Sequence, residues 1–205
     1  MLQRTLLALF VLIFVWSAIR PHDYFTWILE VFPAIIGLAL LVATRRRFPL
    51  TPLLCILLFL HAVILAVGGH YTYAEVPLGM WVRDALGLAR NHYDRLGHFA
   101  QGFVPAILAR EILLRKTPLR SGRWLFFLVT CVCLAISACY EFVEWWTALA
   151  TGEAATAFLG TQGDPWDTQW DMFIALIGAV TAQLLLARTQ DRQLAALTST
   201  PAALD

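Results

Sequence analysis

Six long runs of apolar residues alternate with short polar stretches along the chain. A helix needs about 20 apolar residues to cross a hydrocarbon core of about 30 Å, and these runs approach that length. The pattern therefore predicts six transmembrane helices, and the short loops between them make neighbouring helices antiparallel. The predicted spans are Leu2–Ile19, Tyr24–Ala43, Pro52–Gly68, Tyr93–Leu114, Trp124–Leu149 and Trp170–Ala187.

The first span has a second interpretation as a cleaved signal peptide, because Arg4 precedes the apolar run and the small residues Ser17 and Ala18 follow it. The residues around Ser17 lack the small-x-small pattern of a cleavage site, and the run is long enough to span, which favours an uncleaved anchor. Pro33 and Pro105 interrupt the second and fourth predicted helices, where neighbours or water must replace a missing hydrogen bond.

Composition agrees with this pattern, since 60% of the 205 residues are hydrophobic, 14% are charged and the mean hydropathy is +0.69. These values predict an all-α, polytopic membrane helix bundle. The expected partner is the lipid bilayer; no nucleic-acid ligand is expected, and the oligomeric state is left open. Residues 1–188 are predicted to form one integral membrane domain, and the polar tail 189–205 to be a disordered cytoplasmic end.

Basic residues in short loops stay on the cytoplasmic side of a membrane, so their distribution predicts the orientation. Eleven of the fifteen fall on one side when both termini are cytoplasmic, and only Arg20, Arg83, Arg90 and Arg95 fall outside. The predicted cytoplasmic set is Arg4, Arg45, Arg46, Arg47, Arg110, Arg115, Lys116, Arg120, Arg123, Arg188 and Arg192. The four cysteines lie within spans without metal-ligand spacing and are assigned no role: Cys55, Cys131, Cys133 and Cys139.

Acidic residues and histidines have the opposite distribution. Only Glu111, Asp191 and Asp205 lie on the predicted cytoplasmic side, whereas the other eleven carboxyl groups and all five histidines lie toward the outer side. Residues 78–90 of the outer connection are predicted to form a short interfacial helix with Trp81 at the headgroup level. Any function must draw on this one-sided set of polar groups.

Asp94 and His98 begin the fourth span and lie four residues apart, so they share one face of a helix. A carboxylate and an imidazole at this spacing bind a metal ion together, or the carboxylate orients the ring as a proton carrier. The structural alternative is a pair that only caps and solvates the helix start. Ionisable groups inside a membrane span are costly and usually face an interior cavity, which favours the functional interpretation.

Further acids lie at the outer ends of the last two spans. Glu141 and Glu144 are about one helical turn apart near the end of the fifth span, and Asp164, Asp167 and Asp171 lead into the sixth. Asp164 and Asp167 are also suited to capping, because acids in a first turn complement the helix dipole. Asp171 precedes an uninterrupted apolar stretch, so a purely solvated role fits it less well.

The antiparallel topology brings three helix ends to the same outer face, so Asp94, His98, Glu141 and Asp171 are expected to converge there as candidate catalytic residues. A divalent metal ion is a candidate cofactor, since facing helices build metal sites in this way. A metal-free network in which Arg95 or Arg83 balances the acids is the alternative. The candidate metal ligands are Asp94, His98, Glu141, Glu144, Asp167 and Asp171.

Glu30 and His61 lie deeper, within the second and third spans, and suggest an inward-facing polar cleft below the outer acids. Each is also satisfied if it pairs with a neighbouring backbone group or with the other residue.

Several stretches resemble the YjdF-type bacterial inner-membrane proteins, and the likeness covers nearly the whole chain. It implies a bacterial inner-membrane location and no specified activity. The stretches that carry it are Arg20–Asp23, Phe48–Pro52, Gly69–Pro77, Arg90–Phe99 and Gly160–Met172.

A weaker likeness, restricted to the second half, is to the VanZ-like membrane proteins. Asp94 to Phe99, Glu141, and Asp171 followed by Gly178 occupy the places of that family's pattern, whereas an expected asparagine is Ala175 here. This analogy suggests chemistry at the cell envelope.

Three functions remain open on this basis. The first is a metal-assisted enzyme that acts on an envelope or lipid substrate, with His98 as general base or ligand. Trp145, Trp146, Trp166 and Trp170 would then lie at the headgroup level. The second is a proton- or ion-coupled transporter, although six spans without repeated halves give no sign of inverted symmetry. The third is a non-catalytic envelope binding or resistance factor.

Overall fold

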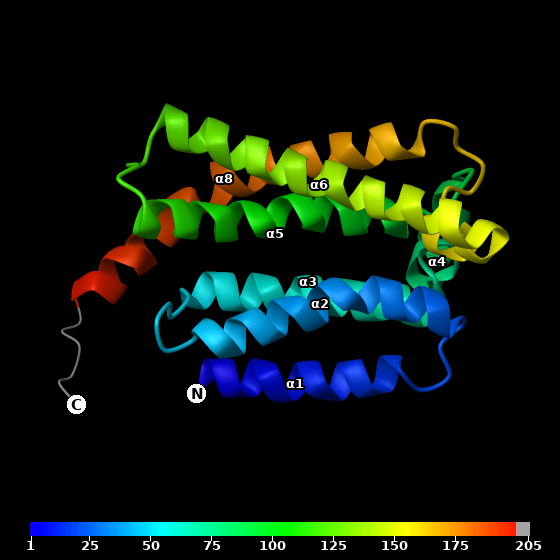
Figure 1. Ribbon diagram of the computed structural model, residues 1–205, viewed down its shortest axis with the longest axis horizontal. Helices are drawn as coiled ribbons and strands as arrows, with labels where there is room; N and C mark the ends of the chain where they lie inside the picture. Colours follow the sequence, from blue (N-terminus) through cyan, green and yellow to red (C-terminus); the bar gives the residue numbers. More distant parts are fainter. Residues whose placement is uncertain (200–205) are drawn as a thin grey trace.

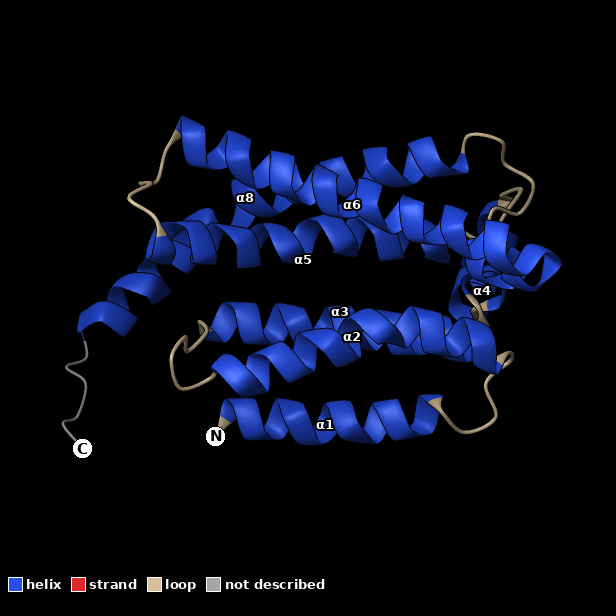
Figure 2. Ribbon diagram, viewed as in Figure 1, coloured by secondary structure: helices blue, strands red, loops and turns tan. Residues whose placement is uncertain are grey.

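Helices joined by loops make up the described part, residues 1–199 of the computed structural model, and this part contains no strand (Figure 2). The all-α prediction is therefore confirmed. The helices are α1 (Leu2–Ser17), α2 (Tyr24–Thr44), α3 (Pro52–Tyr71), η1 (Tyr73–Glu75), α4 (Pro77–Leu86), α5 (Tyr93–Lys116), α6 (Arg123–Thr151), η2 (Gly152–Ala155), α7 (Thr156–Leu159) and α8 (Asp167–Ser199).

The long helices form two groups of three, with α1, α2 and α3 in one and α5, α6 and α8 in the other (Figure 1). Helices α3 and α5 pack against each other and join the two groups. Connections 18–23, 72–92 and 152–166 meet at one end of the bundle, called the acidic end here. Connections 45–51 and 117–122 meet at the other, the basic end, so consecutive long helices are antiparallel as predicted.

Local sequence signals set several helix ends. The Asp23 carboxylate accepts a hydrogen bond of 2.6 Å from the Thr26 backbone N–H and caps α2. Thr51 caps α3, and Pro52 occupies its first turn, where the missing N–H costs no helical hydrogen bond. Gly87 ends α4 with a φ of +63°, a left-handed conformation that glycine adopts without a side-chain clash.

Four helices, α2, α3, α6 and α8, are long and apolar enough to cross a membrane. The six predicted spans correspond in position to α1, α2, α3, α5, α6 and α8. Helix α1 has only 16 residues, and α5 carries several charged residues, so the six-span count and the orientation stay predictions. Large apolar side chains on the outside of the bundle, including Leu12, Ile28 and Leu184, are more than half exposed and suit contact with lipid.

Helices α5 and α8 have the most extensive contact in the bundle. At their crossing, a Cβ atom on Gly102 would lie 1.8 Å from the Ala175 carbonyl oxygen, and one on Gly178 would lie 2.2 Å from the Phe99 carbonyl oxygen. The two backbones therefore touch, as small residues allow in membrane bundles. This contact fixes the separation of Asp94 and His98 on α5 from Asp171 on α8.

A buried polar network joins three helices at the basic end. The Glu111 carboxylate is fully buried and accepts hydrogen bonds from Thr51 Oγ1 (2.7 Å), Arg115 Nη1 (2.9 Å) and Gln190 Nε2 (3.3 Å). Arg110 donates in turn to the Gln190 side-chain oxygen at 3.1 Å. Each charged group has a partner, so this network ties α3, α5 and α8 together.

Other predictions have mixed outcomes. Helix α4 lies within residues 78–90, as predicted apart from its first residue, and Trp81 on it is 69% exposed. Pro33 and Pro105 lie inside helices, and all four cysteines are free. The segment expected to be a disordered tail differs, because α8 continues through Ser199 and so covers residues 189–199. Residues 200–205 lie outside the described part.

Candidate functional site

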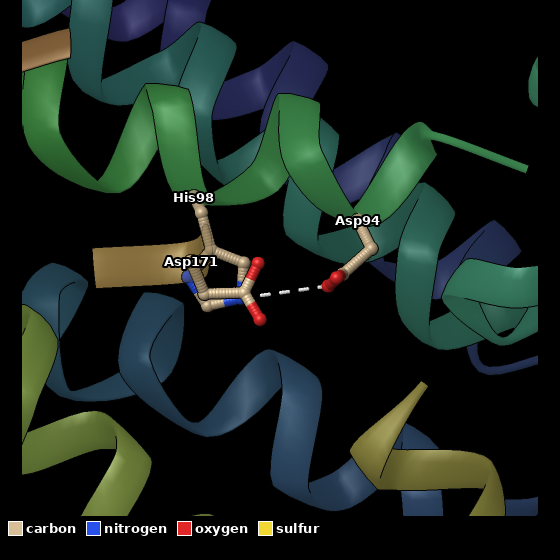
Figure 3. Close-up of side chains that lie close together, drawn as sticks. All are labelled: Asp94, His98 and Asp171. Atoms are coloured by element: carbon tan, nitrogen blue, oxygen red, sulfur yellow. Dashed lines mark ion pairs between the residues drawn. The ribbon is translucent and has the colours of Figure 1, made fainter. Parts of the chain in front are cut away.

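Three buried side chains from two helices meet at the acidic end. On α5, Asp94 and His98 share a face one turn apart, and the close α5–α8 crossing brings Asp171 opposite them (Figure 3). His98 Nε2 lies 3.4 Å from Asp94 Oδ1 and 3.6 Å from Asp171 Oδ1. Each of the three residues is less than 8% exposed. The predicted convergence of these three groups is therefore present in the structure.

The other ring nitrogen of His98 indicates which tautomer faces these carboxylates. Nδ1 lies 3.1 Å from the Gln101 side-chain oxygen and, in this orientation of the amide, donates its proton there. Nε2 is then left with a lone pair that faces two carboxylate oxygens. Such a grouping is favourable only when a proton or a metal ion lies between the nitrogen and the oxygens.

Glu141 and Glu144 approach the same imidazole from α6. Glu141 Oε1 lies 4.0 Å from His98 Nδ1, and suitable ligand atoms of His98, Glu141 and Glu144 all lie within 4.8 Å of one another. Glu141 is 5% exposed, yet neither of its carboxylate oxygens has a hydrogen-bond partner in the described part of the chain. The Thr168 side chain comes near without reaching hydrogen-bond geometry. Burying a carboxylate without a hydrogen-bond donor costs free energy. Glu141 therefore needs a partner that the fold itself does not supply.

Two arginines hold the start of α8. Arg90 Nη1 and Arg95 Nη2 each lie 2.8 Å from Asp167 Oδ1, and both also bind Asp164 Oδ2, at 3.4 and 3.3 Å. Arg95 Nη1 donates to Asp171. Asp167 therefore belongs to this arginine clamp, whereas Asp171 lies between the clamp and His98.

The predicted balancing cations were partly wrong. Arg83 lies on α4 and pairs with its exposed neighbour Asp84, away from the cluster, and its place is taken by Arg90. Asp164 combines two roles, because its other oxygen accepts the Trp166 backbone N–H at 2.9 Å in the turn before α8. This bond closes the turn ahead of α8 and does not involve an N–H of its first helical turn, so the capping interpretation of Asp164 stays a prediction.

Glu30 extends the cluster into the bundle. It is 5% exposed on α2, and the hydroxyl groups of Tyr73 and Tyr140 lie beside its carboxyl group. Burial, reinforced by the nearby Glu30, raises the pKa of Tyr73 well above its usual value, so this residue stays a neutral phenol that is able to donate. Space for its ring depends on Gly68 and Gly97, where a Cβ atom would lie 2.3 and 2.7 Å from ring carbons.

His61, His22 and His70 have other surroundings than this cluster. His61 makes no hydrogen bond or ion pair with the described residues and lines a separate cavity that extends toward the basic end. The alternative in which His61 pairs with Glu30 is therefore not realised, and the two residues do not share one polar cleft. His22 pairs with exposed Glu75 at 3.2 Å, and His70 lies 3.0 Å from the Ser17 carbonyl oxygen.

Asn91 holds the connection that leads into α5, and its role was not predicted. Its side-chain nitrogen donates to the carbonyl oxygens of Ala74 and Val76, and its side-chain oxygen accepts the Tyr93 N–H. Its backbone pairs reciprocally with the Gln162 side chain ahead of α8. The sequence offered one signal for this role: Asn91 and Gln162 lie in two of the stretches that carry the YjdF-type resemblance, Arg90–Phe99 and Gly160–Met172.

The charges at the acidic end do not balance. Within the described residues, seven carboxyl groups at this end face only two guanidinium groups, of Arg90 and Arg95, and one imidazole that pairs with them, that of His98. Carboxylates in a low-dielectric site need protons or a bound cation to offset this excess. The seven are Glu30, Asp94, Glu141, Glu144, Asp164, Asp167 and Asp171.

Comparison with known proteins identifies the family. The profile of the family described as "Predicted membrane protein (DUF2238)" matches residues 2–192. The chain belongs to this family. It is also 60% identical over 183 residues to the inner membrane protein YjdF of Escherichia coli (strain K12), a match that covers 89% of this chain and 88% of the relative. No solved structure matches.

These findings confirm the YjdF-type resemblance, and with the apolar helices they establish a multi-pass protein of the bacterial inner membrane. The descriptions of the family and of the relative name no activity. The likeness to VanZ-like proteins stays an expectation.

Proposed function

We propose that this protein is a membrane-embedded enzyme whose acidic end binds a divalent metal ion and modifies an envelope or lipid substrate. The observation that carries the proposal is the grouping of His98 Nε2 with Asp94 Oδ1 and Asp171 Oδ1, at 3.4 and 3.6 Å. Metal–ligand bonds of about 2.1 Å in tetrahedral geometry separate neighbouring ligand atoms by about 3.4 Å. The three side chains thus suit a shared metal ion with little rearrangement.

The surrounding residues have supporting roles in this proposal. Arg95 holds Asp171, and Gln101 fixes the His98 tautomer, as outer-shell partners do at metal sites. A ligand set of one imidazole and carboxylates suits manganese, iron or zinc, and such an ion supplies Lewis acidity and an activated water. Glu141, whose two oxygens are unpartnered, would serve as the general base in such chemistry.

The surroundings of the site favour an amphiphilic substrate. Exposed tryptophans at the end of α6 and the start of α8 surround the acidic end, and such residues concentrate at the headgroup level of membranes. The excess of basic residues at the basic end supports an orientation with six spans and cytoplasmic termini, in which the cluster would lie at the outer face. The tryptophans are Trp145, Trp146, Trp166 and Trp170.

Glu30 favours a second candidate, a proton- or cation-coupled carrier. The carboxyl group of Glu30 lies below the outer acids and beside two tyrosine hydroxyls, as one step of a path into the membrane would. His61, the next expected step, faces a different cavity. The carrier therefore has less support than the enzyme, and a proteoliposome assay of pH- or ion-dependent flux tests it.

Metal content tests the enzyme proposal. The full-length protein is purified in detergent, incubated with Mn²⁺ or Zn²⁺ and desalted. Its bound metal is then measured by elemental mass spectrometry. We expect one bound ion per chain, and at least tenfold weaker binding in H98A and D171N, because each substitution removes a ligand. The matched controls H92A and D84N change exposed residues of the same types at the same end and should retain the ion.

Thermal unfolding of each variant without metal separates lost ligands from lost folding, and D94N provides a third ligand variant if H98A or D171N unfolds. Wild-type protein that binds neither ion, or that loses metal equally in H92A, would overturn the proposal. Vesicles of E. coli polar lipid, followed by mass spectrometry of the products, then test whether the metal-loaded protein changes a lipid and whether E141Q does not.

A further inference from the structure

A cavity separate from the acidic cluster lies among α1, α2 and α3. Its volume is about 370 Å³, within the range of about 300–1,000 Å³ that is typical of small-molecule sites. Apolar side chains of all three helices line most of it, including Phe10, Leu38 and Leu58. Helices α1 and α2 each pack mainly on α3, which leaves this space between them.

Two features of α2 keep the cavity open. Pro33 lines it at a position where the helix lacks one backbone hydrogen bond. Gly37, one turn further on, also lines it, and a Cβ atom there would meet nothing within 4 Å. The absence of a side chain at Gly37 therefore adds space that neighbouring residues do not fill.

The cavity has a charged rim at the basic end. Arg4 of α1 and Arg45 after α2 line it, both are exposed, and neither makes an ion pair in the described part of the chain. This arrangement matches an amphiphile with an apolar chain and an anionic head. Basic pockets between transmembrane helices recognise anionic lipid headgroups in this way.

We propose that this cavity binds one acyl chain of an anionic phospholipid, with the headgroup against Arg4 and Arg45. The apolar walls bury the chain, and the two unpaired guanidinium groups bind the phosphate. His61 lines the space without carrying the interaction, because an acyl chain offers it no polar partner. This site is independent of the proposed metal chemistry at the acidic end.

Native mass spectrometry of the full-length protein in detergent tests the site. The protein is delipidated and titrated with phosphatidylglycerol or with phosphatidylcholine of the same chains. We expect one tightly bound phosphatidylglycerol and much weaker phosphatidylcholine binding. Each basic residue strengthens binding to an anionic lipid surface about fivefold. The double substitution R4Q/R45Q should therefore weaken phosphatidylglycerol binding about 25-fold.

Two matched controls separate the cavity from general charge and bulk. R46Q/R47Q removes the same charge from the adjacent loop outside the cavity, and should have a much smaller effect. Gly37→Leu fills the cavity and should abolish binding, whereas Ala43→Leu adds bulk to the same helix outside it and should not. Thermal unfolding confirms that each variant is folded.

If the wild-type protein bound phosphatidylglycerol and phosphatidylcholine equally, that result alone would refute the headgroup assignment. Equal losses in R46Q/R47Q and R4Q/R45Q, or retained binding in folded Gly37→Leu, would refute the cavity as the site. A loss in H61L as large as that in R4Q/R45Q would exclude an acyl chain as the occupant.

Discussion

Gly102→Ala is expected to separate the two helices that build the acidic cluster. The new Cβ atom would lie 1.8 Å from the Ala175 carbonyl oxygen, whereas ordinary contact begins at 3.4 Å. The helices must therefore move apart by about 1.6 Å at this crossing if all the relief comes from their separation. Overpacking of this kind typically costs about 1–3 kcal/mol, and a clash with backbone belongs at the upper end.

The same movement should disturb the candidate metal site. His98 lies one turn from Gly102 on α5, and Asp171 lies one turn from Ala175 on α8, so the 3.6 Å separation of Nε2 and Oδ1 increases with the helix distance. Metal–ligand bonds tolerate changes of only about 0.2 Å. We expect a lower free energy of unfolding and at least tenfold weaker metal binding, although no ligand is replaced.

Unfolding in mixed detergent, followed by far-UV circular dichroism, measures the first effect, and metal titration measures the second. Gly37→Ala is the matched control, because a Cβ atom there meets nothing within 4 Å and should cause no loss of stability. Gly178→Ala should resemble Gly102→Ala, and the double variant should lose less than the sum, since one separation relieves both clashes. Wild-type stability in Gly102→Ala would mean that these backbones do not touch.

Three further predictions concern the supports of the fold. Asn91→Ala should cost at least about 2 kcal/mol of unfolding free energy, because it leaves the buried Val76 carbonyl oxygen without its donor, and chemical denaturation measures this loss. Glu111→Ala should lower the free energy of unfolding by about 3 kcal/mol or more, whereas a comparable loss in the half-exposed control Asp191→Asn would contradict the importance of burial. Asp23→Ala should cost about 1 kcal/mol and Asp23→Asn less. The hydrogen bond from the Thr26 N–H lowers the pKa of Asp23 in the folded protein. The carboxylate therefore contributes to the free energy of unfolding at pH values above its unfolded-state pKa of about 4, and this contribution is lost as the pH falls through the lower folded-state pKa. A stability advantage of the wild type over Asp23→Ala that grew on acidification would contradict this.

Much of the candidate site could be predicted from local spacing. Asp94 and His98 lie four residues apart on a helix, and any helical conformation puts them on one face. Asp171 could be added because antiparallel helices bring alternate ends to the same side. Spacing could not choose between Arg83 and Arg90, since that depends on how α4 turns away from the bundle.

The sequence by itself determined the helical class, the positions of the apolar helices and the polarity of the two bundle ends, because each follows from neighbours along the chain. Only the tertiary structure decided which polar groups meet. In the folded protein Glu30 lies near the acids of the cluster, whereas His61 lines another cavity, although both residues belong to apolar helices. The physical reason is that helix rotation and separation depend on close packing, here at Gly102 and Gly178, and hydrophobic periodicity does not specify these contacts.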